Sequence, residues 1–545
     1  MKKRLSFLFS MLLLVSMFLT ACGGDDKADE KKGGDDKKSD VPQELRVNIS
    51  SEPFSLNPGL ANDSTSASVL HQTFEGLTRI DADGKPQPAM AEKITTSDDL
   101  LTYTFELRDA KWTNGDPVTA EDFVYAWKWA LDPANQSQYA YQLYYVKGAE
   151  AINTGGAAVD TLGVKAVDEK TLEVTLENPT PYFLELTAFY TYFPVNNKVA
   201  TENPNWYTEA GDKYVSNGPF KLAEWEHSAN IVLEKNADYW DADTVKLEKV
   251  QMSIINDANT ELSMFDNGEL DWAGAPFGTL PTDSMKALKD EGRLTTQPIA
   301  GTYWYKFNTE KEPLNNVNIR KALAYAIDRQ SIIDNITQGG QIPAMAAVPP
   351  SMFEENEKGY FKDNDVKKAK EFLEKGLKEL NLKDASELPA IAISYNTNEA
   401  HQKIAQAIQD MWKKELGIEV TLNNQEWAVY IEQLHAGDYQ VGRMGWLGDF
   451  NDAINFLELY RDKEGGNNDT NWENAEFKQL LMDSQKETDA KKRIQMLKDA
   501  EKIFIDEMPV APIYFYTHNW VQVENLKDVV VTGLGDVQLK WAYFE

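Results

Sequence analysis

Cysteine is almost absent from this chain, which has one residue of this type, Cys22, among 545. A protein with a single cysteine cannot form an internal disulfide. Histidine is also scarce, and the five residues lack the spacing of a metal site. They are His71, His227, His401, His435 and His518. The chain contains no nucleophile elbow, no paired-histidine zinc motif and no phosphate-binding loop. We therefore expect a protein that is not an enzyme and that needs no metal or cofactor.

Positive charge is the second shortage. The 55 lysine and arginine residues face 87 aspartate and glutamate residues, which gives a formal net charge of −32. This balance argues against nucleic acid and against an anionic bilayer surface as partners. Carboxylates are so abundant that acidic pairs will occur by chance, so a pair of acids alone is no evidence for a catalytic site.

The apolar run at the start of the chain is too short for a stable membrane span. Residues 1–4 (MKKR) are charged and residues 5–19 are mostly apolar, which is typical of a secretory signal. The run ends in Leu19-Thr20-Ala21-Cys22, which resembles the bacterial lipoprotein processing box. In such signals the cysteine is lipidated and becomes the first residue of the mature chain. We expect a signal peptide at 1–21 and a lipid on Cys22; the alternative is a plain signal peptide followed by an unrelated cysteine.

Residues 22–40 are expected to form a disordered tether. After Cys22 this segment contains no apolar residue larger than alanine, so it cannot bury surface. A lipidated cysteine and a flexible tether would hold the folded part at the extracytoplasmic face of a cell membrane. This arrangement suits a Gram-positive bacterium.

Strands and helices alternate along the rest of the chain. Alternating apolar residues predict strands at 44–49, 101–107 and 418–422. Helical periodicity predicts helices at 119–130, 316–333 and 400–416, the last ending at Gly417. The pattern indicates an α/β or α+β class, and the length implies more than one lobe.

The stretch GRMGWLGDFND, residues 442–452, places Asp449 between a glycine and a phenylalanine. A Gly-Asp pair is most often a surface turn. The alternative is that Asp449 is held ready for a cation that the protein itself does not supply.

Six segments, in this order, resemble a single family: 103–108 (YTFELR), 116–124 (DPVTAEDFV), 216–220 (SNGPF), 234–240 (EKNADYW), 267–271 (NGELD) and 319–329 (IRKALAYAIDR). They resemble the extracellular solute-binding proteins of peptide-importing ABC transporters, of the oligopeptide-binding type. The resemblance implies a fold like that of type II periplasmic binding proteins, with two lobes that close about a hinge and an additional domain. The first lobe would comprise 41–74, 199–300 and 517–545, the additional domain 75–198, and the second lobe 301–516. Hinge closure on a ligand is the usual motion of such proteins.

The same resemblance implies a function. The protein would capture short peptides in extended form and deliver them to the transmembrane permease subunits of an importer with cytoplasmic ATPases, acting as a monomer. Alternatives with the same fold are a receptor for a peptide pheromone or for cell-wall peptides, and a binding protein for nickel chelates, heme or sugar.

Peptides of any sequence share only a backbone and two charged ends. The resemblance assigns the peptide's α-ammonium to Asp449. Arg443 lies six residues earlier, about 20 Å away along a strand at ~3.3 Å per residue, and would serve the carboxylate end. His401 occupies the position of a second carboxylate-side group. Alternatives remain: a structural ion pair for Arg443, and a helix cap or surface position for His401.

Further site residues are implied by the resemblance. Tyr139 would reach the amino end of the ligand, and Trp427 and Trp446 would line pockets, although a core role is the alternative for each. Glycines around Trp446 and Leu447, among them Gly445, would let the peptide backbone approach closely.

The chain departs from its enterobacterial relatives at two places. Thr337 stands where they have a lysine for peptide carboxylates, which leaves open which group binds that end. Gly301 and Leu447 stand where they bridge two cysteines.

Overall fold

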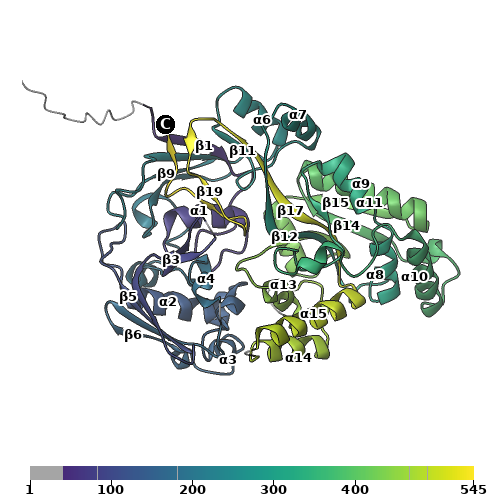
Figure 1. Ribbon diagram of the computed structural model, residues 1–545, viewed down its shortest axis with the longest axis horizontal. Helices are drawn as coiled ribbons and strands as arrows, with labels where there is room; N and C mark the ends of the chain where they lie inside the picture. The colour runs from purple at the N-terminus through teal and green to yellow at the C-terminus, as the bar shows by residue number, and fades with distance from the viewer. Residues whose placement is uncertain (1–40, 83, 181, 465–466, 488) are drawn as a thin grey trace, which may run out of the picture. The chain divides into compact units, whose positions relative to one another are not determined.

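The computed structural model describes residues 41–545 except 83, 181, 465–466 and 488 (Figure 1). The segments expected to form a signal peptide and a tether, and the expected lipidation of Cys22, lie outside the described residues. Within the described part of the chain, no helix is both long and apolar enough to cross a membrane.

Three sheets of four or more strands organise the described residues. The residues expected in the first lobe form a four-stranded sheet in the order β1 (Glu44–Asn48), β10 (Lys249–Ser253), β9 (Asn230–Lys235) and β8 (Phe220–Glu226). Those expected in the additional domain form a second sheet in the order β4 (Ala91–Thr96), β5 (Thr102–Leu107), β7 (Thr171–Thr175) and β6 (Val164–Asp168).

The largest sheet joins segments expected in the first lobe to segments expected in the second. Its order is β11 (Trp272–Gly274), β17 (Val510–Gln522), β12 (Thr295–Phe307), β16 (Val441–Leu447), β14 (Ile391–Asn396) and β15 (Val420–Gln425), and β13 (Ile342–Pro343) pairs with β17. The two long strands β12 and β17 pair with each other and contain both expected hinge positions, 300 and 516. Their register is irregular between Pro298 and Thr302. The chain thus passes between the expected lobes as two hydrogen-bonded strands.

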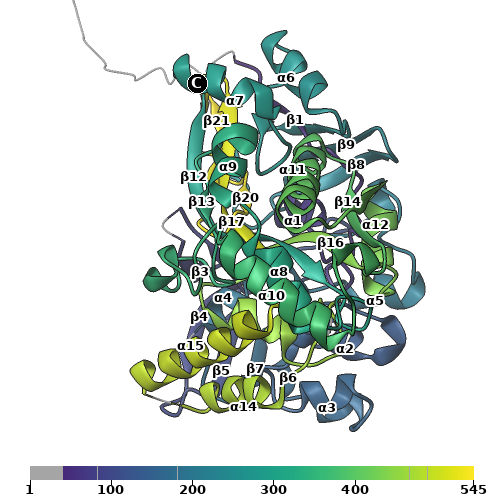
Figure 2. The same ribbon diagram turned by 90° about the vertical axis from the view of Figure 1, so that its right-hand side faces the viewer.

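Helices pack on these sheets on both sides of the β12–β17 pair (Figures 1 and 2). The first-lobe segments contribute α1 (Ser64–Thr73), α5 (Asn197–Glu202), α6 (Ala258–Asp266) and α7 (Met285–Asp290). The additional-domain segment contributes α2 (Ala120–Leu131), α3 (Ala149–Asn153), α4 (Phe183–Leu186) and the short helices η2 (Ala140–Leu143) and η4 (Tyr190–Tyr192). The second-lobe segment contributes α8 (Val317–Tyr325), α9 (Arg329–Ile332), α10 (Val366–Glu379), α11 (Glu399–Leu416), α12 (Trp427–His435), α13 (Ile454–Leu457), α14 (Ala475–Ser484) and α15 (Ala490–Glu507).

Two of the three predicted helices are confirmed. Helix α2 begins with a capping box in which Thr119 and Asp122 satisfy each other's backbone groups. Helix α11 buries its apolar stripe and ends at Gly417, whose φ of 70° is the left-handed conformation that glycine adopts most easily.

The single helix predicted at 316–333 is wrong, because the chain forms α8 and α9 with a break between them. The Asp328 side chain accepts the backbone N–H of Ser331 and so starts a new helix. The buried Arg329 guanidinium donates to the carbonyls of Ala324 and Ile327, which fixes the break. The predicted strand at 418–422 is also shifted, and begins at Val420.

Candidate functional site

A cavity of about 390 Å³ collects every ligand residue expected from the sequence. Its walls come from all three sets of segments that were expected to form separate domains. The expected residues among its lining are Tyr139, His401, Trp427, Arg443, Gly445, Trp446, Leu447 and Asp449, and Thr337 lines it too. The hypothesis that Asp449 forms only a surface turn therefore does not describe its position.

Strand β16 leaves part of its backbone edge open toward this cavity. Along one edge it pairs with β12 over its whole length, from Val441 to Leu447. Along the other edge β14 pairs only with Val441 and Gly442. Because Gly448 N–H donates to β12 and antiparallel residues alternate in direction, Gly445 and Leu447 direct their backbone groups to the open edge. An extended peptide could add here as a further strand.

Asp449 follows β16 directly, and neutral groups orient its carboxylate. The side-chain amides of Gln142 and Asn455 both donate to its Oδ2 atom, the second at 3.2 Å. The Asp449 backbone N–H donates in turn to Asn455 Oδ1 at 3.0 Å. Among the described residues no lysine, arginine or histidine forms an ion pair with Asp449, so the carboxylate is oriented without being neutralised.

The electrostatic environment of Asp449 disfavours its charged form. Burial raises the pKa of Asp449 well above its ordinary value, and the carboxylates of Asp536 and Glu458 raise it further. Hydrogen bonds from Asn455 and Tyr139 act in the opposite direction. A positive group beside Asp449 would relieve both effects, since an opposite charge favours ionisation.

Arg443 is the counterpart of Asp449 at the other end of β16. Its guanidinium donates to Tyr516 Oη at 3.0 Å and to Asn396 Oδ1 at 3.2 Å, and it lies over the Tyr303 ring at 4.7 Å. Its Nε atom is buried without a hydrogen-bond partner. No carboxylate of the described chain pairs with Arg443, so the proposed structural ion pair is absent there.

His401 lies near Arg443, at the start of α11. Its Nδ1 atom is 3.3 Å from the Tyr303 hydroxyl. Burial lowers the pKa of His401 well below its ordinary value, and the positive charge of Arg443 lowers it further. The imidazole is therefore neutral at pH 7, and Arg443 is the one lysine or arginine that lines this cavity within the described residues.

Aromatic rings form the wall beside Asp449. Tyr139 stacks on Trp446 with ring centroids 6.0 Å apart, and the Trp446 indole N–H donates to Asn455 Oδ1 at 2.9 Å. Trp446 is thus buried and lines the cavity at once, so its core and lining roles coincide. Trp427, the first residue of α12, is half-buried.

Gly445 has a structural reason in addition to the one expected from the sequence. A Cβ atom at this position would lie 2.3 Å from the Tyr516 hydroxyl, so the missing side chain leaves room for that ring. At Gly448 the nearest atom would be the flexible end of Met352, at 3.1 Å. Close approach of a peptide backbone is therefore not the only demand for glycine in this stretch.

The structure also describes the residues at the two positions where the sequence departs from the enterobacterial pattern. The Thr337 hydroxyl donates to Gln341 Oε1 at 2.9 Å, so it is engaged within its own loop. Gly301 and Leu447 are direct partners across β12 and β16. The positions expected to replace a cysteine pair thus face each other.

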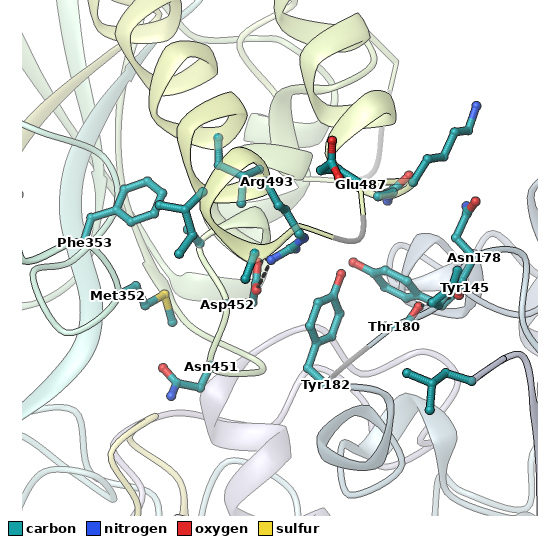
Figure 3. A pocket seen from close by; sticks show the side chains of 18 of the residues that line it. Tyr145, Asn178, Thr180, Tyr182, Met352, Phe353, Asn451, Asp452, Glu487 and Arg493 are labelled. Carbon is teal, nitrogen blue, oxygen red and sulfur yellow. Dashed lines mark hydrogen bonds and ion pairs between the residues drawn. The ribbon is translucent and has the colours of Figure 1, made fainter. Parts of the chain in front are cut away.

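A second cavity, of about 410 Å³, lies between the additional-domain segment and the second-lobe segment (Figure 3). Its arginine, Arg493, donates to both oxygens of Asp452 at 2.7 and 2.9 Å, and Tyr182 and Tyr145 stand across from them in Figure 3. The charge of Arg493 is therefore already compensated by Asp452 within this cavity.

Sequence reasoning missed Gln142, Asn455, Tyr516 and Asp536. Asn455 stands six residues after Asp449, but no spacing rule predicts the hydrogen bond between them. Gln142 lies 307 residues from Asp449 in the chain, and nothing in its local sequence indicates the contact.

Comparison with known proteins assigns the class. The model for bacterial extracellular solute-binding proteins, family 5, matches residues 85–468, and the chain belongs to this family. It is 64% identical to the oligopeptide-binding protein OppA of Bacillus subtilis, over 100% of both chains. The structure resembles that of Haemophilus influenzae OppA in complex with the peptide RPPGFSPFR, with a TM-score of 0.86, 32% identity and coverage of 93% and 99% of the two chains. It also resembles Listeria monocytogenes OppA bound to peptide, with a TM-score of 0.84, 33% identity and coverage of 92% and 99%.

Proposed function

We propose that this protein captures short peptides in extended form in the 390 Å³ cavity and delivers them to the permease of an ABC importer. The observation that carries the proposal is the open edge of β16, with Asp449 and Arg443 at its two ends and no ion pair at either of them among the described residues. In this proposal Asp449 binds the α-ammonium of the peptide, and Arg443 binds its carboxylate. Names and ligands of the relatives agree with this reading.

Affinity would come mainly from groups that all peptides share. The backbone groups of Gly445 and Leu447 would bond the peptide main chain, which reads no side chain. A charge-assisted bond from the ammonium to Asp449 would gain strength as water leaves the closing cavity. His401 would supply a neutral hydrogen-bond partner near the carboxylate end. Tyr139, Trp446 and Trp427 would shape the side-chain pockets.

The wider arrangement belongs to the same proposal. The first lobe, the additional domain and the second lobe would be the segments expected above, with the hinge in β12 and β17. The mature protein would be a monomer that is held by lipid on Cys22 at the extracytoplasmic face of a Gram-positive membrane. It would have no catalytic role and no cofactor.

Native mass spectrometry of the purified protein tests this function directly. We expect co-purified peptides of mixed sequence, and we expect N-acetylated peptides to displace them much more weakly than free peptides. One unique bound peptide would indicate a receptor instead of a nutrient importer. Equal binding of acetylated and free peptides would refute the role of Asp449.

A further inference from the structure

The amino end of the cavity holds more carboxylates than one peptide ammonium requires. Asp63, Asp449 and Asp536 all line the cavity. Asp63 has a structural task, because it caps α1 by accepting the Ser66 backbone N–H at 3.0 Å and the Ser66 hydroxyl at 2.6 Å. Asp449 is assigned to the ammonium by the proposed function. Asp536 has no task in either account.

The backbone holds Asp536 firmly in place. It ends the turn between β19 (Val530–Val531) and β20 (Val537–Gln538), which pair with each other. Its N–H donates to Thr532 Oγ1 at 3.1 Å, and its carbonyl accepts the Thr532 N–H at 2.9 Å. A residue of β17 also contacts this turn, since His518 Nε2 lies at hydrogen-bonding distance, 3.0 Å, from the Gly535 carbonyl oxygen.

The carboxylate of Asp536 is almost without partners. In the part of the chain that the structure describes, no lysine or arginine pairs with it and no hydrogen bond reaches it. Its ion-pair contact among these residues is the buried His71, whose Nε2 atom is 3.5 Å away. Burial lowers the pKa of the buried His518, and the charge of Asp536 acts in the opposite direction and raises it. The side chain is 27% exposed, which leaves it accessible from the cavity that it lines.

The charge of Asp536 acts on the same space as that of Asp449. Burial raises the pKa of Asp449 most, and Asp536 raises it further, as noted above. Burial likewise raises the pKa of Tyr190, and the charges of Asp449, Asp63 and Asp536 add to this effect. One ammonium at Asp449 leaves the second negative charge uncompensated, in a space from which the ligand removes water. A further positive charge there would gain more than it would in bulk water.

We propose that Asp536 is a specificity-determining residue, which favours peptides that carry lysine or arginine within their first two residues. This inference rests on the proposed function, since it takes the peptide's amino end to lie at Asp449. The ligand class becomes peptides with two positive charges at the amino end.

Calorimetry with matched peptides tests the inference. The ligands are tri-, tetra- and pentapeptides of alanine, and the same peptides with lysine or norleucine at the first or the second position. Norleucine keeps most of the lysine chain and lacks its charge. In the wild-type protein we expect lysine to bind about fivefold more tightly than norleucine at one of these positions, the effect of one partly screened charge pair.

The variant Asp536→Asn should abolish this ratio and change the affinity for alanine peptides much less than that for lysine peptides. The control Asp528→Asn removes an equal charge from an exposed residue of the same C-terminal segment, at a φ of 53° that asparagine tolerates, and should keep the ratio. Equal binding of lysine and norleucine peptides by the wild type would overturn the proposal. So would an unchanged ratio in Asp536→Asn, or an equal loss for all peptides, which would assign Asp536 a structural task at His71. Failure of every peptide to bind would instead refute the proposed function.

Discussion

Replacing Asp449 with asparagine separates the charge of this group from its hydrogen bonds. Gln142 and Asn455 both donate to Oδ2, so the asparagine oxygen has to stay there to keep these bonds. The amide NH₂ then faces the peptide's ammonium and repels it. If the amide turns over, the oxygen faces the ligand and the NH₂ meets two amide donors. Asn455 cannot adapt, because its oxygen already accepts two N–H groups, those of Asp449 and Trp446.

The expected loss follows from this geometry. Two unit charges about 4 Å apart interact by about 4 kcal/mol at the effective dielectric constant near a protein surface. Breaking one partner of a buried, hydrogen-bonded charge pair commonly costs about 2–5 kcal/mol of binding free energy. At about 1.4 kcal/mol for each factor of ten, the peptide dissociation constant should rise by tens- to thousands-fold.

Isothermal titration calorimetry with a free peptide measures this change. The control Asp438→Asn removes one charge from an exposed residue of the same second-lobe segment and should leave affinity unchanged. Circular dichroism and the unfolding temperature establish that the Asp449→Asn variant is folded. An unchanged affinity in a folded variant would show that the ammonium binds elsewhere.

Three further predictions concern other parts of the site and the second lobe. Gly445→Ala should weaken peptide binding, measured by calorimetry, because the new Cβ displaces the Tyr516 ring whose hydroxyl accepts a hydrogen bond from Arg443. Gly448→Ala should have a milder effect. Peptides with a C-terminal amide should bind more weakly than free acids, because they lack the carboxylate charge that Arg443 is proposed to bind. Equal affinities would contradict this role of Arg443. Burial alone would raise the pKa of Asp469, but the Lys306 ammonium beside it lowers this pKa to about 2. The Lys306–Asp469 pair therefore stabilises the fold above the ordinary aspartate pKa of about 3.9, and this stabilisation is lost as pH falls toward 2. Asp469→Asn should lower the free energy of unfolding at pH 7 by about 3–5 kcal/mol, measured by urea titration.

Local sequence patterns predicted the elements that are stabilised locally. Helix α11 was predictable because its cap, its apolar stripe and its terminal glycine all act within its own span. The break between α8 and α9 was not, because Arg329 also donates to the Pro512 carbonyl, 183 residues later. Such a contact exists only in the folded chain, while the local pattern from 316 to 333 continues as one helix.

The site shows the same division. Asp449 was predictable because its segment carries a recognisable pattern that resembles one family. The groups that orient Asp449 were not, since a glutamine in η2 carries no signal for an aspartate after β16. The second reason for Gly445 could not be predicted, because Tyr516 lies on β17 and no local feature indicates that its ring fills the space.

The neutral donors around Asp449 would couple peptide binding to the expected closure. A lysine or arginine beside the carboxylate would stabilise it better, but would leave nothing for the ligand's ammonium to do. Without any donor, the buried carboxylate would lack both orientation and compensation. Side-chain amides orient the carboxylate and leave its charge uncompensated. One of them, Gln142, belongs to the additional-domain segment, while Asp449 belongs to the second-lobe segment. Asn455 orients the carboxylate from within the second-lobe segment, whereas Gln142 adds its hydrogen bond only where the two segments meet. A peptide that favours the ionised form of Asp449 would therefore favour that meeting as well.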